Sequence, residues 1–248
     1  MQTVFPPVTQ NSLLTLKKSV RSRLIIAIDG PAGAGKSTVA MALAKKLELH
    51  YMDTGAMYRA LALKVQTLGI GTKDAQRLAE SCSQSRIEFG DGDPQPIFLD
   101  GKDVSDQIRT LEIGELASAL SVHPEVRKQL VALQQKILEN GGATLEGRDA
   151  TTVIAPGAPI KIFLTASLEE RTRRRFSELK TKGLQVTYAE VKAQIAERDQ
   201  RDTTRKASPL RIAEDATVID SQQMNVDEVV EQILNLMHQW IKTIELES

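Results

Sequence analysis

Residues 30–37 carry the clearest chemical signal in the chain, the run Gly-Pro-Ala-Gly-Ala-Gly-Lys-Ser. The run follows a short apolar segment, 24–29, and precedes a segment with helical periodicity, 37–47, which is the context that a phosphate-binding loop requires. Its glycines let backbone N–H groups surround an anion, and the N-terminus of the next helix adds a positive dipole. We therefore expect phosphates to be bound by Gly30, Ala32, Gly33, Ala34, Gly35, Lys36, Ser37 and Thr38.

Lys36 and Ser37 supply the side-chain chemistry of this loop. A lysine at this position reaches the β- and γ-phosphates of a nucleotide, and the serine hydroxyl binds Mg²⁺. ATP or another nucleoside triphosphate, together with Mg²⁺, is therefore implied. The loop leaves the phosphoryl acceptor open, because motors, GTPases and enzymes that phosphorylate small metabolites share it.

Arginines recur along the chain in positions that suit a polyanionic acceptor. Asp53 and Thr54 end a second short apolar stretch and should cap the next helix, so Arg59 lies one turn into that helix and could hold a phosphate through two hydrogen bonds. The alternative for Arg59 is a solvated surface position, and surface pairs with nearby acids explain part of the run 169–175. Residues 197–202 pack opposite charges so densely that a polar site is favoured there. The other arginines considered are Arg109, Arg127, Arg148, Arg171, Arg173, Arg174, Arg175, Arg198, Arg201 and Arg205.

Such arginines suit phosphoryl transfer between two nucleotides, because both reactants are polyanions that repel each other. Catalysis of this reaction is mostly positioning and charge neutralisation. The attacking phosphate oxygen is already ionised at neutral pH, so no general base is required. The histidines, His50, His123 and His238, are scattered and receive no role.

The composition favours one globular domain without bulk attraction to polyanions. The 248 residues contain 32 Lys and Arg against 32 Asp and Glu, so neither nucleic acid nor an anionic membrane is an expected partner. No run approaches the roughly 20 apolar residues that cross a bilayer. Cys82 is the one cysteine of the chain, which excludes an intramolecular disulfide and suits the reducing cytoplasm. Residues 1–23 hold basic residues and no acid, and a disordered leader is preferred over a transit sequence.

Apolar strands alternate with helices along the chain, which predicts a parallel sheet flanked by helices on both faces. Strands are expected at 24–29, near 51–52, and at 143–146, 160–164 and 217–219. Helices are expected at 37–47, 55–68, 110–121, 124–140, 167–182 and 226–240. Residues 86–89 and 96–99, separated by turn residues, predict a small antiparallel hairpin. The predicted fold class is therefore α/β, a P-loop NTPase-type parallel sheet with an antiparallel insertion.

Together these runs resemble the motifs of bacterial-type cytidylate kinases, members of the P-loop nucleoside monophosphate kinases, over about residues 24–240. The matching runs are Ile-Asp-Gly-Pro-Ala-Gly-Ala-Gly-Lys-Ser at 28–37, Asp-Thr-Gly-Ala-Met-Tyr-Arg at 53–59, Asp-Val-Ser at 103–105, Ile-Arg-Thr at 108–110, Glu-Gly-Arg-Asp at 146–149, Lys-Ile-Phe-Leu-Thr-Ala-Ser at 161–167, and Glu-Arg-Asp and Arg-Asp within 197–202. The hairpin near 86–99 also distinguishes this family from shorter adenylate kinases.

The resemblance implies ATP-dependent phosphorylation of CMP and dCMP with Mg²⁺, in pyrimidine nucleotide metabolism. It also implies a single kinase domain at 24–248, with its core at 24–69 and 123–248. A lobe that binds the nucleoside monophosphate would span about 54–122, and a helical lid would span about 168–207.

The resemblance further implies a role for each matching residue. The cytosine site would be formed by Thr54, Ser118, Arg127 and Asp149, with Arg109 nearby. The CMP phosphate would be bound by Arg59 and Arg148. The ribose would be held by Arg198 and Asp202, and Arg205 would lie on the phosphate side. The catalytic charges would come from Lys36, Arg148, Arg174 and Arg175.

One position departs from the family pattern. The family usually has Arg-Asp-x-Gly-Thr, and this chain has Arg-Asp-Ala-Thr-Thr at 148–152. If the glycine serves a positive φ, Thr151 would be strained and would shift Arg148 and Asp149. If threonine tolerates the backbone conformation, the enzyme stays competent, and competence is the expectation.

Two other functions share part of these features. A shikimate kinase also has a phosphate loop and arginines, but its chains are shorter and need neither the hairpin nor the 197–202 cluster. A regulatory module descended from a kinase would bind nucleotide without turnover, and the departure at Thr151 keeps that alternative open. Nucleic-acid binding is disfavoured, because no basic stripe interleaves with aromatic residues. A cytoplasmic monomer is the default expectation.

Overall fold

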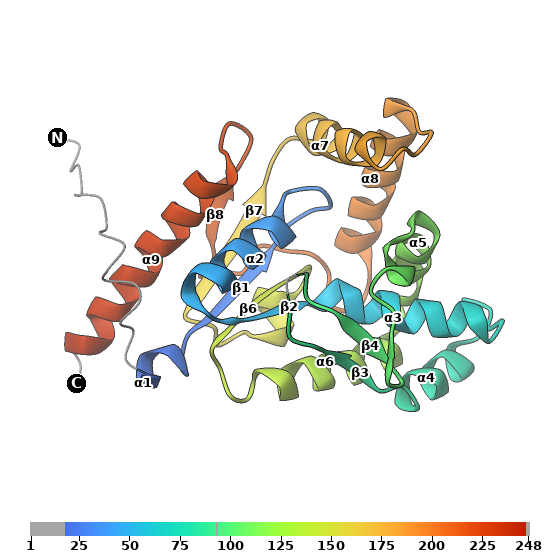
Figure 1. Ribbon diagram of the computed structural model, residues 1–248, viewed down its shortest axis with the longest axis horizontal. Helices are drawn as coiled ribbons and strands as arrows, with labels where there is room; N and C mark the ends of the chain where they lie inside the picture. Colours follow the sequence, from blue (N-terminus) through green and yellow to red (C-terminus); the bar gives the residue numbers. More distant parts are fainter. Residues whose placement is uncertain (1–17, 93, 247–248) are drawn as a thin grey trace.

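The computed structural model describes residues 18–92 and 94–246, and its centre is a five-stranded parallel sheet (Figure 1). The order β2-β6-β1-β7-β8 joins the strands β1 Ile25–Asp29, β2 His50–Asp53, β6 Ala143–Gly147, β7 Ile160–Thr165 and β8 Thr217–Asp220. Asp29 pairs in register with Gly147, and Asp53 with Glu146. The strands therefore end at one common edge, where α/β sheets bind ligands. The predicted parallel sheet is confirmed.

Residues of β1 alternate between the two faces of the sheet, and both faces are buried. Ile26 and Ile28 pack with residues of α2 (Lys36–Leu47) and α9 (Val226–Leu246). Ala27 belongs to a second cluster that includes residues of α6 (Pro124–Leu138) and of a π-helical turn, η3 (Ala150–Ile154). This burial on both sides explains why β1 is a continuous apolar run.

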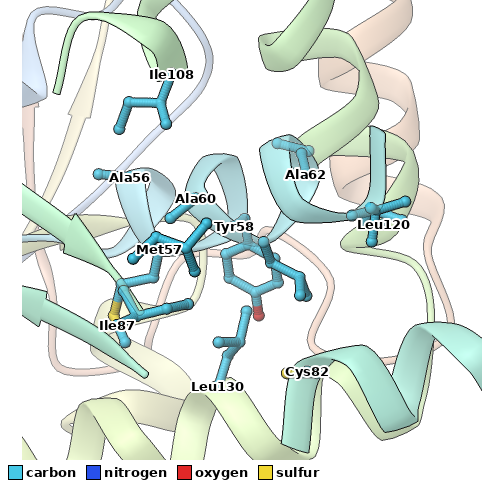
Figure 2. Packing of buried hydrophobic residues seen from close by; sticks show 14 of the residues in the cluster. Ala56, Met57, Tyr58, Ala60, Ala62, Cys82, Ile87, Ile108, Leu120 and Leu130 are labelled. Atoms are coloured by element: carbon cyan, nitrogen blue, oxygen red, sulfur yellow. The ribbon is translucent and has the colours of Figure 1, made fainter. Parts of the chain in front are cut away.

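A lobe with its own core follows β2 (Figure 2). Its elements are α3 Thr54–Thr67, α4 Ala75–Ser83, β3 Ile87–Phe89, β4 Ile97–Leu99, β5 Lys102–Asp103, the 3₁₀ turn η2 Gln107–Arg109 and α5 Leu111–Leu120. The predicted hairpin is confirmed as β3 and β4, and β5 adds a third antiparallel strand. The core of the lobe also contains α6 residues, so α6 packs against both the lobe and the main sheet.

Two helices, α7 (Leu168–Thr181) and α8 (Tyr188–Thr204), occupy the predicted lid (Figure 1). Thr187 and Glu190 form a capping box that starts α8. A small apolar cluster joins Leu179 of α7 and Ile195 of α8 to Ala32 of the phosphate loop. Helices α7 and α8 therefore rest directly on that loop.

The predicted leader lies outside the described residues up to position 17. Residues Lys18–Arg21 form the short helix α1, and Arg21 pairs with Glu48 at 2.9 Å. No described helix has the length and apolar character needed to cross a membrane.

Candidate functional site

The phosphate loop bends through three glycines with positive φ, Gly30 at 151°, Gly33 at 77° and Gly35 at 92°. A Cβ on Gly30 would lie 2.0 Å from the Leu164 carbonyl oxygen, so β7 leaves no room for a side chain there. Gly35 precedes α2 without a side-chain cap. The first N–H groups of α2 therefore have no side-chain cap to satisfy them, and they suit a bound anion.

Lys36 is buried beside this loop, and its Nζ donates a hydrogen bond to the Pro31 carbonyl oxygen at 2.8 Å. Burial, and then the nearby positive charge of Arg148, lower the pKa of Lys36 to about 7. The carboxylates of Glu146 and Asp29 oppose this fall but do not cancel it, so an anion bound beside Lys36 and Arg148 would be stabilised.

Ser37 donates a hydrogen bond to Oε1 of Glu146 at 2.6 Å. Glu146 lies near the carboxyl end of β6, and its backbone oxygen accepts a hydrogen bond from the Thr54 hydroxyl at 2.8 Å. Hydroxyl and carboxylate oxygens are suitable Mg²⁺ ligands, so Ser37 and Glu146 could hold the ion. Glu146 is absent from the predicted site residues, although an acid near the end of an apolar strand beside β1 was a usable signal.

Asp53, at the end of β2, pairs with two of the predicted substrate-binding arginines. Its side chain caps α3 by accepting a hydrogen bond from Ala56 N at 2.9 Å. The carboxylate also pairs with Arg59 at 3.5 Å and with Arg109 at 3.2 Å. The arginines thus converge from α3 and η2, where an anion could replace part of their contact with Asp53.

Asp202 on α8 lies close to three further arginines. Its carboxylate lies 2.8 Å from Arg148 Nε, 3.6 Å from Arg205 Nη1 and 4.0 Å from Arg198 Nε. Burial alone would raise the pKa of Asp202, but these arginines, Arg148 first, hold it below its usual value. Burial and the charge of Arg148 lower the pKa of Arg198 to about 10. Positive charge therefore exceeds negative charge at this point.

Arg127 and Asp149 form a buried ion pair beneath that cluster. Arg127 also donates to the Ser121 carbonyl oxygen at 3.1 Å, and its guanidinium lies 5.5 Å from the centre of the Tyr58 ring. Arg205 approaches the same Asp149 carboxylate at 3.9 Å, which connects this pair to the Asp202 cluster.

Ser118 of α5 lies close to this region, where its hydroxyl accepts a hydrogen bond from Arg201 at 2.8 Å. Eight of the ten predicted substrate-binding residues thus belong to ion-pair groups around Asp53, Asp149 or Asp202. The other two make single hydrogen bonds, Thr54 to the Glu146 backbone and Ser118 to Arg201.

Helices α7 and α8 reach the phosphate loop through Arg171 and Asp199, which are absent from the predicted site residues. Arg171 donates to the Ala32 carbonyl oxygen at 2.9 Å and pairs with Asp199, whose Oδ1 accepts from Ala32 N at 2.9 Å. Of the two predicted lid charges, Arg174 also approaches the loop. Its Nη1 lies 3.5 Å from the Ala34 carbonyl oxygen and 3.0 Å from the hydroxyl oxygen of Ser221, at the start of the β8–α9 connection. Arg175 pairs with Glu178 of its own helix at 2.7 Å.

A family model described as cytidylate kinase matches residues 26–239. A cytidylate kinase from Caldanaerobacter subterraneus is 51% identical over 208 residues, which are 84% of this chain and 92% of that relative. A cytidylate kinase from Pseudothermotoga lettingae is 46% identical over 89% of this chain and 97% of its own length. A third from Carboxydothermus hydrogenoformans is 48% identical over 86% of this chain and 96% of its own length.

This chain belongs to the cytidylate kinase family. The predicted family and fold class are thus confirmed. As a cytidylate kinase the chain is a phosphotransferase acting on nucleotides, which sets the shikimate kinase alternative aside.

Thr151 is the position where this cytidylate kinase departs from the expected glycine. Among the described residues, a positive φ outside glycine occurs at Glu48, Asp100 and Ser208, so Thr151 carries no such strain. Its backbone N and its hydroxyl both donate to Oδ2 of Asp29, at 2.8 and 2.6 Å. Threonine therefore fits the backbone conformation at this position, and catalytic competence stays a prediction.

Proposed function

We propose that this cytidylate kinase transfers the terminal phosphoryl group of ATP to CMP and dCMP, yielding ADP with CDP or dCDP. The observation that carries the proposal is the hydrogen bond from Ser37 of the phosphate loop to Glu146, because Glu146 lies two residues before Arg148, whose Nε bonds to Asp202 at 2.8 Å. This contact brings the loop for the nucleoside triphosphate next to the arginines for the acceptor. A phosphoryl group passing from donor to acceptor would lie between these two groups.

The pair Arg127 and Asp149 supports a preference for cytosine. Cytosine offers an amino group that donates hydrogen bonds, and a carboxylate such as Asp149 accepts them. Uracil has a carbonyl oxygen at that place, which the carboxylate would repel. Arg127 can donate to the ring acceptors, and Thr54 and Ser118 lie at the border of the same region. We assign these four residues to the base.

The remaining arginines serve the acceptor's phosphate and sugar. Arg59 and Arg148 would bind the phosphate, with Arg109 beside Arg59. The Arg198–Asp202 pair would hold the ribose, and Arg205 connects Asp202 to the base site. When CMP binds, these arginines would give up part of their contacts with Asp53 and Asp202 and would contact the phosphate instead. The need to bind this phosphate explains why arginines outnumber acids in the site.

The reaction needs no proton transfer from a side chain. An ionised oxygen of the CMP phosphate attacks the γ-phosphorus of ATP, the bond from that phosphorus to the bridging oxygen breaks, and ADP leaves. Lys36, Arg148 and Arg198 neutralise the charge that spreads over the transferred oxygens. Mg²⁺, held by Ser37 and Glu146, would supply further neutralisation. The N–H groups at the start of α2 hold the phosphates of the donor.

The lid, residues 168–207, would close over ATP and exclude water, which otherwise competes as an acceptor. Arg171 and Arg174 are the lid arginines nearest the loop, and Arg175 would need to move to take part. We further propose a cytoplasmic monomer that binds neither nucleic acid nor membrane. The neutral net charge and the single, buried Cys82 support this assignment.

A coupled assay of ADP release tests the function, with ATP, Mg²⁺ and, in parallel, CMP, dCMP, UMP, AMP or shikimate. Turnover with CMP and dCMP well above the others is expected. Asp149→Ala should raise KM for CMP or cut turnover strongly, and an unchanged kcat/KM would remove Asp149 from the site. Activity with none of the acceptors, while ATP still binds, would establish the regulatory module instead.

A further inference from the structure

Asp29 lies at the carboxyl end of β1, directly before the phosphate loop, and its side chain is fully buried. Its oxygen Oδ1 accepts a hydrogen bond from Ala150 N at 2.8 Å. Its oxygen Oδ2 accepts two hydrogen bonds from Thr151, one from the backbone N at 2.8 Å and one from the hydroxyl at 2.6 Å. One short segment, residues 150–151, therefore supplies all three of these hydrogen bonds.

The segment that holds Asp29 directly follows Arg148 and Asp149, which we assign to CMP. Arg148 bonds to Asp202 at 2.8 Å, and Asp149 pairs with Arg127. Asp29 in turn is bonded covalently to Gly30 of the phosphate loop. The contact between Thr151 and Asp29 is thus a short link between the donor loop and the residues that bind the acceptor.

The Thr151 hydroxyl also matters for the charge of Asp29. Burial raises the pKa of Asp29 to about 6, and the hydrogen bond from the Thr151 hydroxyl opposes that rise. The charged groups that face Asp29 are Asp149, which raises the pKa further, and Lys36 of α2, whose own charge Asp29 favours. A protonated Asp29 could no longer accept all three hydrogen bonds.

We propose that Thr151 is a positioning residue of this kinase, whose hydroxyl acts through Asp29 to hold Arg148 and Asp149 in register with the phosphate loop. The inference rests on the proposed function, because it assumes that these two residues bind CMP. Thr151 itself touches neither substrate.

Thr151→Val tests the proposal, since valine keeps the shape of threonine and removes the hydroxyl. Thr152→Val is the matched control, because the Thr152 hydroxyl is buried without a hydrogen-bond partner among the described residues. Thr151→Ser keeps the hydroxyl and should behave as the wild type. A lost hydrogen bond to a charged group corresponds to about a tenfold change or more, so calorimetry at pH 7 should show CMP binding to Thr151→Val weakened by about that factor. ATP binding should change far less.

The pH dependence of folding supplies a readout that needs no substrate. Because the pKa of Asp29 is raised to about 6 from 3.8, the folded state binds more protons than the unfolded chain between these values. Its contribution to the free energy of unfolding therefore falls as pH rises through that window, and levels off above it. In Thr151→Val the pKa of Asp29 rises further, so the fall should continue about one pH unit higher. Urea unfolding between pH 4 and 8 measures this.

These measurements distinguish a failure of the proposed function from a failure of the positioning role of Thr151. If the wild type does not bind CMP, the proposed function fails and this inference fails with it. If the wild type binds CMP but Thr151→Val matches Thr152→Val in CMP affinity, only the positioning role is overturned. A pH window of stability that is the same in Thr151→Val and Thr151→Ser would overturn the link through Asp29.

Discussion

Raising the pH should weaken ATP binding, because Lys36 loses its proton in the free protein near pH 7. Burial and Arg148 lower its pKa to about 7 from 10.5. This difference corresponds to about 5 kcal/mol of differential interaction between the charged and neutral forms. The phosphates of ATP would restore the charged form, so at high pH binding must take up a proton.

The size of the effect follows from the fraction of Lys36 that is protonated before binding. With a pKa of about 7, roughly half of the protein carries the proton at pH 7 and about 3% at pH 8.5. The apparent affinity for Mg·ATP should therefore fall about fifteenfold over this range, with nearly one proton taken up per ATP at pH 8.5. The free energy of unfolding of the free protein should rise with pH, whereas the affinity for ATP falls. The unfolded chain binds more protons than the folded state above pH 7, so this group alone raises the free energy of unfolding as pH rises.

Calorimetry in two buffers with different ionisation enthalpies counts the protons taken up. Lys36→Met should bind ATP more weakly and abolish the uptake. Lys46→Met, which changes an exposed lysine of the same helix, should leave uptake and affinity as in the wild type. An affinity that is constant from pH 7 to 8.5, with no proton uptake by the wild type, would refute the low pKa and the crowding of Lys36 by Arg148.

The packing of the site allows further predictions. Gly30→Ala should lower the free energy of unfolding by more than about 3 kcal/mol in urea titrations, because its Cβ would lie 2.0 Å from the Leu164 carbonyl oxygen. Gly157→Ala meets nothing within 4 Å and should change that free energy by less than about 0.5 kcal/mol; equal effects would contradict the close approach. Arg127→Leu leaves the buried Asp149 carboxylate without its closest partner and should cost about 3–5 kcal/mol. In a double-mutant cycle Asp149→Leu should recover part of this loss, and strictly additive losses would show that the pair does not interact.

Local sequence patterns predicted the elements whose residues obey one period throughout. The apolar run 24–29 corresponds to β1, because a strand buried on both faces is apolar without interruption. The segments 86–89 and 96–99 correspond to β3 and β4, because turn residues separate two short apolar runs. Helix α4 (Ala75–Ser83) was not predicted, although Asp74 caps it and Leu78 and Cys82 share its buried face. The two-residue strand β5 is too short to show any period.

The functional site also has one part that the sequence predicted and another that only the folded structure shows. The phosphate loop is local, since its glycines and Lys36 follow one another along the chain, and its place between a strand and a helix was readable from the residues. The partners of the arginines are distant in sequence, as in the contact between Arg148 and Asp202. Only the folded chain shows that Arg171 and Asp199 hold Ala32, whereas Arg175 pairs within its own helix.

Residues 150–154 show the physical reason for this division. Their sequence, Ala-Thr-Thr-Val-Ile, is rich in β-branched residues that favour a strand, yet the structure has a π-helical turn. The Asp29 carboxylate, more than a hundred residues earlier, accepts hydrogen bonds from the backbone N–H groups of Ala150 and Thr151 and so decides the conformation. The sequence by itself determined the family, the parallel sheet and the phosphate loop, because those depend on local order. The tertiary structure decided which charges meet, because a buried charge takes the partner that folding brings to it.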